Sequence, residues 1–188
     1  MAGNAQKHHL RLWNLWRLAG WGAAAALLLL PLFAMQFTDE VNWDLADFAF
    51  AGALVAGVGV TYELAARMTG NRAYRAAVGV ALAAAFILVW MNVAVGIIGS
   101  EDNPANSMYY GVLAVGIVGA IVARLQPRAM ARSLVATALA QMSVAVIALI
   151  AGLDFPGLIT VFFAALWLTS AWLFRKAARE QTSASTAP

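Results

Sequence analysis

Several long stretches of this chain carry no charged residue. Residues 18–37 and 78–99 each contain about 20 apolar or small residues without a single Asp, Glu, Lys or Arg. An α-helix of that length crosses a hydrocarbon layer of roughly 30 Å. Of the 188 residues, 63% are hydrophobic and only 11% are charged, where a soluble domain carries about a quarter. The sequence therefore predicts an integral membrane protein of the all-α class.

Apolar runs alternate with polar breaks along the whole chain, and this alternation predicts a helical bundle of six transmembrane helices arranged as three hairpins. The membrane domain is expected over residues 18–175, after a basic, Trp-rich interfacial segment at 1–17 and before a disordered cytoplasmic tail at 176–188. The six predicted spans are about 18–37, 46–66, 76–99, 105–123, 133–152 and 157–174.

The charged residues alternate between the connections in the way that six spans require. All 12 Lys and Arg residues fall in the N-terminal segment, the second and fourth connections, and the C-terminal tail. Seven of the nine acids fall instead in the first, third and fifth connections. Because basic residues are retained on the cytoplasmic side, this pattern predicts that both termini are cytoplasmic. One alternative is that residues 1–34 are a cleaved signal peptide, which would leave five spans.

The composition also limits the chemistry that the chain can support. There is no cysteine, and the only histidines, His8 and His9, lie in the N-terminal segment. No catalytic set, paired carboxylates in one cavity or phosphate-binding loop can be recognised, so we predict no enzyme activity, no cofactor and no metal site. The net charge of +3 is explained by membrane topology, so no nucleic-acid partner is expected.

The sequence "NPA" at residues 103–105 matches the tripeptide that lines the constriction of aquaporins. Asn is a favoured N-cap residue, and Pro is favoured at the first helical position because its missing N–H would be unpaired there. Asn103 and Pro104 are therefore predicted to begin a helix. Asp154 and Pro156 are predicted to begin the last span in the same way. In the first connection, Asn42 or Asp44 can cap the following helix. The alternative is that the acids of these connections form a vestibule that attracts cations.

Three polar residues are predicted to lie within the bilayer. Glu63 stands four residues before Arg67, so an ion pair near the cytoplasmic boundary is favoured over a proton or cation site. Asn92 and Gln141 can each hydrogen-bond across helices, and the alternative is that they line a permeation path.

Small residues predict where helices approach each other closely, either within the bundle or between protomers. They form two groups, one in the second span and one in the fourth: Gly52, Ala56 and Gly59, then Gly111, Gly116 and Gly119.

Three stretches carry a resemblance: "AMQFTDEVNWDLADF", "YELAARMTGNRAYRAAVGVAL" and "AVGIIGSEDNPANSMYYGVLAVGI". Over about residues 25–175 the chain resembles a family of small, uncharacterised bacterial multi-pass inner-membrane proteins. The resemblance implies the bacterial cytoplasmic membrane as the location and brings no activity. The expected role is a non-catalytic helix-packing or accessory module in the lipid bilayer, which associates with itself or with a membrane-protein partner. The alternative is a small channel or transporter with an acidic outer mouth, for a cation or a small neutral solute.

Overall fold

A computed structural model of the chain describes the backbone of residues 2–38 and 41–186, and the side chains of 18–38 and 41–185. Within these ranges the chain is all-helical and contains no strand. The helices are α1 (Ala2–Ala34), α2 (Leu45–Met68), α3 (Arg72–Ala94), the short 3₁₀ helix η1 (Pro104–Ser107), α4 (Met108–Ala123), α5 (Pro127–Ile150) and α6 (Gly157–Thr186). The all-α class predicted from the sequence is confirmed.

Five helical stretches in the described part of the chain are long and apolar enough to cross a membrane. They are Leu45–Met68, Arg72–Ala94, Pro104–Ala123, Pro127–Ile150 and Gly157–Ser185. The apolar part of α1 with described side chains, Leu18–Ala34, is shorter, although the helix itself continues back to Ala2. The side chains of the predicted interfacial segment at 1–17 lie outside the described residues.

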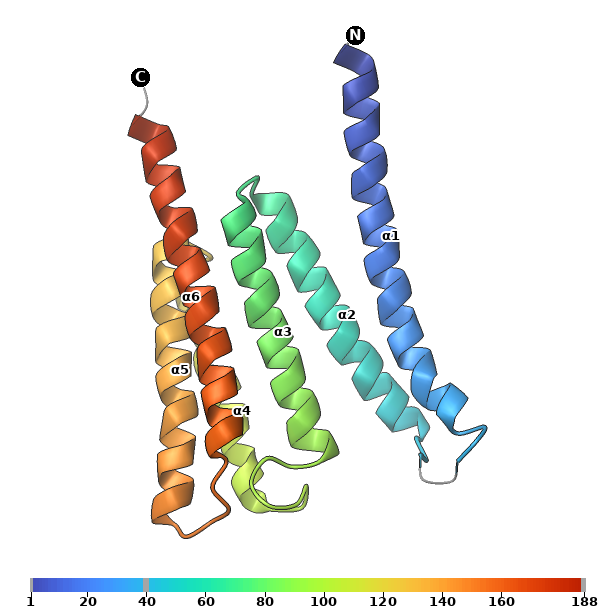
Figure 1. Cartoon of the computed structure of the whole chain (residues 1–188), viewed down its shortest axis with the longest axis vertical. Helices are drawn as coiled ribbons and strands as arrows, with labels where there is room; N and C mark the ends of the chain where they lie inside the picture. The colour runs from blue at the N-terminus through green and yellow to red at the C-terminus, as the bar shows by residue number, and fades with distance from the viewer. Residues whose placement is uncertain (1, 39–40, 187–188) are drawn as a thin grey trace. The chain divides into compact units, whose positions relative to one another are not determined.

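The chain divides into two compact units, the first reaching Val60 and the second beginning at Thr61. In the first unit, α1 and the first part of α2 form a hairpin (Figure 1). Asp44 caps α2, because its Oδ1 accepts from the backbone N–H groups of Ala46 at 2.7 Å and Asp47 at 2.9 Å. The Asp47 carboxylate accepts in return from the Asp44 N–H at 2.9 Å.

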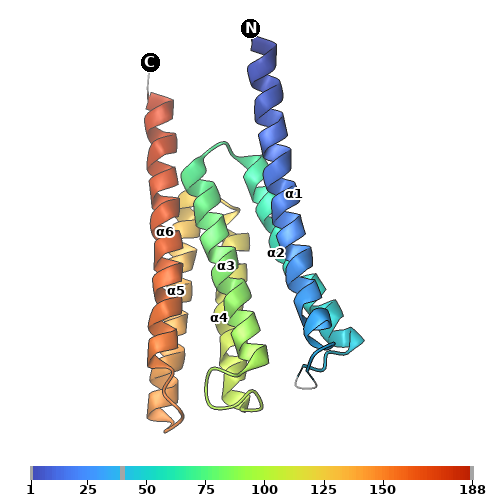
Figure 2. The same ribbon diagram turned by 45° about the vertical axis from the view of Figure 1, so that its right-hand side comes forward.

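The second unit is built around four antiparallel helices, α3 to α6. Figures 1 and 2 show α3 and α5 running in one direction and α4 and α6 in the other. Helix α6 packs against both α3 and α5, and α4 packs mainly against α5. The α6 contacts are close because alanines such as Ala77, Ala84 and Ala177 are completely buried in the core. Small side chains allow helix backbones to approach closely, and in a bilayer such packing replaces the hydrophobic effect as the source of association.

The antiparallel order gathers basic residues at one end of the second unit and acids at the other. Arginines and one lysine lie at the start of α3, around the α4–α5 turn and in the second half of α6. Glu101, Asp102 and Asp154 lie in the connections at the opposite end. At the basic end, the Tyr74 ring packs edge-on against Phe174, with centroids 5.0 Å apart, and its hydroxyl donates to the Leu125 carbonyl at 2.8 Å.

The C-terminal segment differs from the sequence prediction. Residues 176–186 continue α6, where a disordered tail is predicted at 176–188, so that prediction is wrong as far as Thr186. The physical reason is tertiary contact at the basic end. Ala177 is fully buried, Asn71 Nδ2 donates to Glu180 Oε2 at 2.8 Å, and Arg128 donates to the Thr182 hydroxyl at 3.0 Å. Small polar residues are weak helix formers alone, but neighbouring helices can order them.

A buried hydrogen bond joins α6 to α3 and offers a direct test of this packing. The Ser170 hydroxyl, which is fully buried, donates to the Ala77 carbonyl at 2.7 Å. We expect Ser170→Ala to lower the free energy of unfolding by about 0.6 kcal/mol, and by no more than about 1.7, the range for bonds between membrane helices. Reversible unfolding in mixed micelles measures this loss. Ser183→Ala is the control, because that exposed hydroxyl donates to a carbonyl of its own helix and should change little.

Candidate functional site

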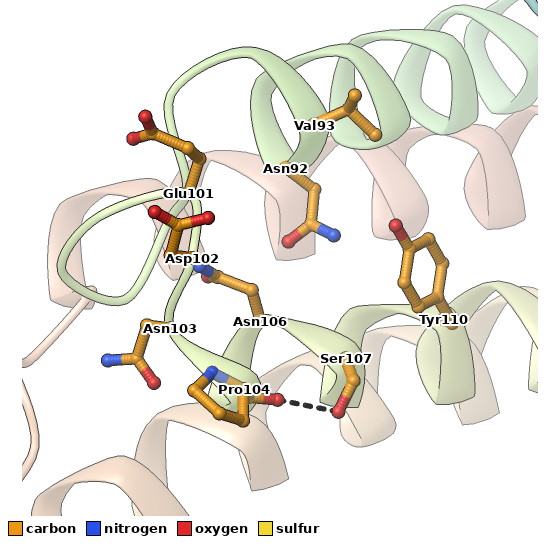
Figure 3. Close-up of a pocket in the computed structure, with 9 residues that line it drawn as sticks. All are labelled: Asn92, Val93, Glu101, Asp102, Asn103, Pro104, Asn106, Ser107 and Tyr110. Atoms are coloured by element: carbon orange, nitrogen blue, oxygen red, sulfur yellow. Dashed lines mark hydrogen bonds between the residues drawn. The ribbon is translucent and has the colours of Figure 1, made fainter.

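A pocket of about 390 Å³ lies at the acidic end of the second unit, between the end of α3 and the start of α4. Figure 3 shows Asn92 and Tyr110 reaching into the same space from α3 and α4, with the connecting loop on the other side. The pocket brings together two of the predicted groups, an intramembrane amide and the residues of the Asn-Pro-Ala turn. Its lining consists of Asn92, Val93, Glu101, Asp102, Asn103, Pro104, Asn106, Ser107 and Tyr110.

The Asn-Pro-Ala turn forms one wall of the pocket as a helix start. The Asn103 side chain accepts from the Ala105 N–H at 3.0 Å, and Pro104 occupies the first position of η1. The Ser107 hydroxyl donates to the Pro104 carbonyl at 2.7 Å, which is the bond drawn in Figure 3. The first turn is 3₁₀ rather than α, and α4 continues from Met108. The turn therefore places the polar side chains of Asn103 and Ser107 at the start of the η1–α4 span, beside the pocket.

Asn106, which the sequence analysis does not single out, holds the loop that closes the pocket. Its side chain is 4% exposed, and its Oδ1 accepts from the backbone N–H groups of Ile97 at 2.9 Å and Ile98 at 2.8 Å. Its Nδ2 donates to the Ser100 carbonyl at 2.8 Å. Buried backbone groups outside helices need such partners. The available sequence signal is an Asn in the first turn of a helix that follows a glycine-containing loop.

Two glycines let this loop turn back on itself. Gly96 has a φ of +71°, and a Cβ there would lie 2.5 Å from the backbone carbonyl of Ser100. Gly99 has a φ of +68°, and a Cβ there would lie 3.1 Å from the Asp154 carboxylate and 3.2 Å from Asn103 Nδ2. Only glycine adopts such a conformation without strain while leaving room for these neighbours. Asp154 therefore lies beside the loop. The backbone carbonyl of Pro156, the other residue of that predicted cap, accepts from the Thr160 N–H at 2.8 Å.

Asn92 has an unusual environment within the pocket. Its side chain is only 5% exposed, and its Oδ1 finds no hydrogen-bond partner among the described residues. Figure 3 shows the amide pointing into the pocket rather than into a neighbouring helix. An unpaired buried amide costs about 1–3 kcal/mol. Asn92 is thus a buried residue near the end of α3 whose amide oxygen has no packing hydrogen bond within the described chain.

Gln141 lies in the helical interior, apart from the pocket lining. Its side chain is 0% exposed, and neither amide atom forms a hydrogen bond to any residue that the structure describes. It stands one helical turn beyond Thr137, whose hydroxyl faces Gly116 of α4. Ser133 Oγ and Trp167 Nε1 are also buried without a hydrogen-bond partner in the described chain. The second unit therefore holds several polar groups that its own packing leaves unpaired.

The unpaired amide of Gln141 predicts an unusual mutational effect. We expect Gln141→Met to leave the free energy of unfolding unchanged or to raise it, by up to about 1–3 kcal/mol, because the unbranched thioether fills similar space without an unpaired amide. Reversible unfolding in mixed micelles measures the change. Thr137→Val is the comparison, since its hydroxyl donates to the Ser133 carbonyl at 3.0 Å and its removal should be destabilising. A large loss of stability in Gln141→Met would mean that the amide is satisfied in the membrane.

Glu63 forms an ion pair with Arg67, the residue one turn further along α2. The two side chains approach to 2.9 Å, with Arg67 58% exposed and Glu63 20% exposed. The pair lies in the last part of α2, and Glu63 does not belong to the described pocket lining. This geometry matches the pairing that the sequence analysis favours. An exposed pair of this kind contributes little to stability, about 0.3–0.5 kcal/mol.

The predicted packing glycines have different surroundings. Gly116 and Gly119 face α5: a Cβ on Gly116 would lie 3.4 Å from the Thr137 hydroxyl oxygen, and one on Gly119 would overlap the Ser133 side chain. Gly59 lies against the Trp21 ring, and a Cβ on Gly59 would lie 2.9 Å from that ring. Gly52 and Gly111 have no neighbour within 4 Å of such a Cβ among the described residues, and Ala56 is half-buried.

No family model, no curated protein and no solved structure matches this chain.

Proposed function

We propose that this chain is a non-catalytic, multi-pass protein of the bacterial cytoplasmic membrane. In this proposal it crosses the bilayer six times with both termini in the cytoplasm. It acts as a helix-packing accessory module, in a homo-oligomer or in a larger membrane complex.

The uneven burial of the spans carries this proposal. In α5 and α6, 39% of the apolar window is buried inside the chain, whereas the value is only 17% for the η1–α4 span. Ile117, Ile121 and Val122 are among the exposed apolar side chains of α4. Lipid or another helix must cover such a surface. Gly52 and Gly111 lie on α2 and α4 with open space around them, and small residues of this kind allow a second helix to approach closely.

The distribution of charge supports the proposed orientation. Basic residues gather at one end of the second unit, and membrane proteins keep such residues on the cytoplasmic side. They are Arg67, Arg72, Arg75, Arg124, Arg128, Arg132, Arg175, Lys176 and Arg179. A reporter fused to the C-terminus tests the orientation, because a reporter that is active only outside the cytoplasm would contradict it.

Gentle purification at native expression, followed by mass measurement of the intact particle, tests the proposed role. We expect a particle larger than one 188-residue chain with its lipid and detergent. Gly111→Leu should reduce this association without unfolding the chain, because the added side chain points into open space. A monomer at native expression, unchanged by Gly111→Leu, would contradict the accessory role.

The polar groups without partners favour a small channel or transporter as the second candidate. Asn92 faces a pocket at the acidic end, and Gln141 lies buried further along the bundle. Intramembrane polar groups of this kind often mark pathways for ions or solutes. Flux of alkali cations and small neutral solutes into liposomes tests this candidate. Flux that is absent, or that is unchanged in both Asn92→Leu and Gln141→Met, would exclude these residues as its path.

A further inference from the structure

We propose that the pocket between α3 and α4 is a binding site for a small organic cation that carries one or two ammonium groups. The inference concerns a site rather than the assembly of the protein, so it does not rest on the accessory role proposed above.

The sign of the charge in the pocket selects a cation. Glu101 and Asp102 both line it, and no lysine or arginine does. Neither carboxylate forms an ion pair with a residue in the described part of the chain. Asp154 lies just behind the loop, beside Gly99. An anionic ligand would meet repulsion from all three groups, whereas an ammonium ion would gain charge-assisted hydrogen bonds, which are about twice as strong as neutral ones.

Asn92 supplies independent evidence that the pocket has an occupant. The residue is 95% buried by the chain, its side chain points into the pocket, and its oxygen has no hydrogen-bond partner among the described residues. The turn of acidic residues alone would be explained by helix capping and solvation, but neither explains a buried amide without a partner. An ammonium N–H is the donor that this oxygen lacks, and binding would remove the cost of leaving it unsatisfied.

The shape and the wall of the pocket distinguish an organic cation from a bare metal ion. A calcium ion needs six to eight oxygen ligands, and the described residues contain no group of three or more Asp, Glu, His or Cys side chains that could hold a metal. The volume of about 390 Å³ lies in the range of small-molecule sites. Tyr110 and Val93 add an aromatic ring and an apolar surface, which suit the ring-facing approach of a cation and the carbon chain that carries it.

The walls of the site are held in place before any ligand arrives. Asn106 fixes the loop through the Ile97 and Ile98 N–H groups, and Asn103 fixes the start of η1. A preformed site loses less conformational entropy on binding. Asn106 and Asn103 are positioning residues in this scheme, while Asn92, Glu101 and Asp102 contact the ligand.

Titration calorimetry with the full-length protein in nanodiscs of neutral lipid tests the proposal. The probe is putrescine, and 1,4-butanediol is the uncharged control of similar length. Calcium chloride tests whether the pocket binds a metal ion instead. We expect saturable binding of one putrescine per chain and no saturable binding of butanediol. The two ligand-contacting variants are Asn92→Leu and the double change Glu101→Gln/Asp102→Asn, and each should weaken putrescine binding at least tenfold.

A matched control separates the pocket from overall charge. Asp44→Asn/Asp47→Asn removes two acids from the first connection, keeps side-chain acceptors for the cap of α2, and should leave putrescine binding within twofold of wild type. Glu101 and Asp102 are exposed, so their amide variants should fold even if Asn92→Leu does not. Three results would each overturn the proposal: no saturable putrescine binding, equal binding by the double pocket variant, or calcium binding tighter than putrescine binding.

Discussion

Asn106→Ala is expected to lower the free energy of unfolding by about 3 kcal/mol or more, the largest effect of a single truncation in the pocket region. The substitution removes the only side chain in the described part of the chain that accepts from the Ile97 and Ile98 N–H groups. Leaving a buried donor unpaired costs about 1–3 kcal/mol, and here two are left at once. Reversible unfolding in mixed micelles measures the total, and hydrogen exchange should show faster exchange at these two amides.

Ser107→Ala is the control for this change, because it lies next in the chain and alters only one local bond. The Ser107 hydroxyl is exposed and donates to the Pro104 carbonyl of the same turn, so its loss should cost less than about 1 kcal/mol. Equal losses in the two variants, or unchanged exchange at Ile97 and Ile98, would show that Asn106 does not hold the loop.

Gly119→Leu is expected to destabilise the second unit by about 3 kcal/mol, or to prevent folding. A Cβ at this position already overlaps the Ser133 side chain and would lie 2.8 Å from Ser133 Cβ, so a leucine forces α4 away from α5. Overpacking of this kind typically costs about 1–3 kcal/mol and occasionally more. The free energy of unfolding in mixed micelles measures the effect. Gly111→Leu on the same helix is the matched control, because nothing described lies within 4 Å of its Cβ.

A double-mutant cycle tests the same contact without a large side chain. Gly119→Ala should be destabilising alone, and Ser133→Gly should relieve it, because the two atoms nearest the new Cβ, Ser133 Oγ and Cβ, would then be absent. The double variant should therefore be more stable than the sum of the single changes predicts. Strict additivity would mean that these residues do not meet, and that Gly119 is available to a partner chain instead.

The sequence alone was sufficient to predict an all-α chain with several apolar helices, and their approximate limits. The predicted spans 46–66 and 105–123 correspond to Leu45–Met68 and Pro104–Ala123. This succeeds because hydropathy and helix-start chemistry are local: a charge or a Pro acts where it stands. The six crossings and their orientation remain predictions, and the C-terminal reporter fusion tests them.

The environment of individual side chains could not be predicted in the same way. The sequence identifies Gly111 and Gly119 as equivalent small residues, yet the structure packs Gly119 against α5 and leaves Gly111 open. It identifies Asn103 and Asn92 but not Asn106, the residue with the most buried hydrogen bonds in that turn. Rotation of a helix about its axis decides these environments, and a uniformly apolar helix carries little periodic signal of that rotation.

Two results depend on contacts between distant segments. The helical C-terminal segment is hydrogen-bonded to Asn71 and Arg128, which lie 109 and 54 residues away from their partners on α6. The pocket requires Asn92 on α3 to face Tyr110 on α4 across a loop that two left-handed glycines turn back. Local composition specifies which segments are helical and apolar, because burial in a bilayer depends on composition along the chain. Which polar groups meet and which stay unpaired depends instead on how the helices pack, because packing brings together residues that are far apart in the chain.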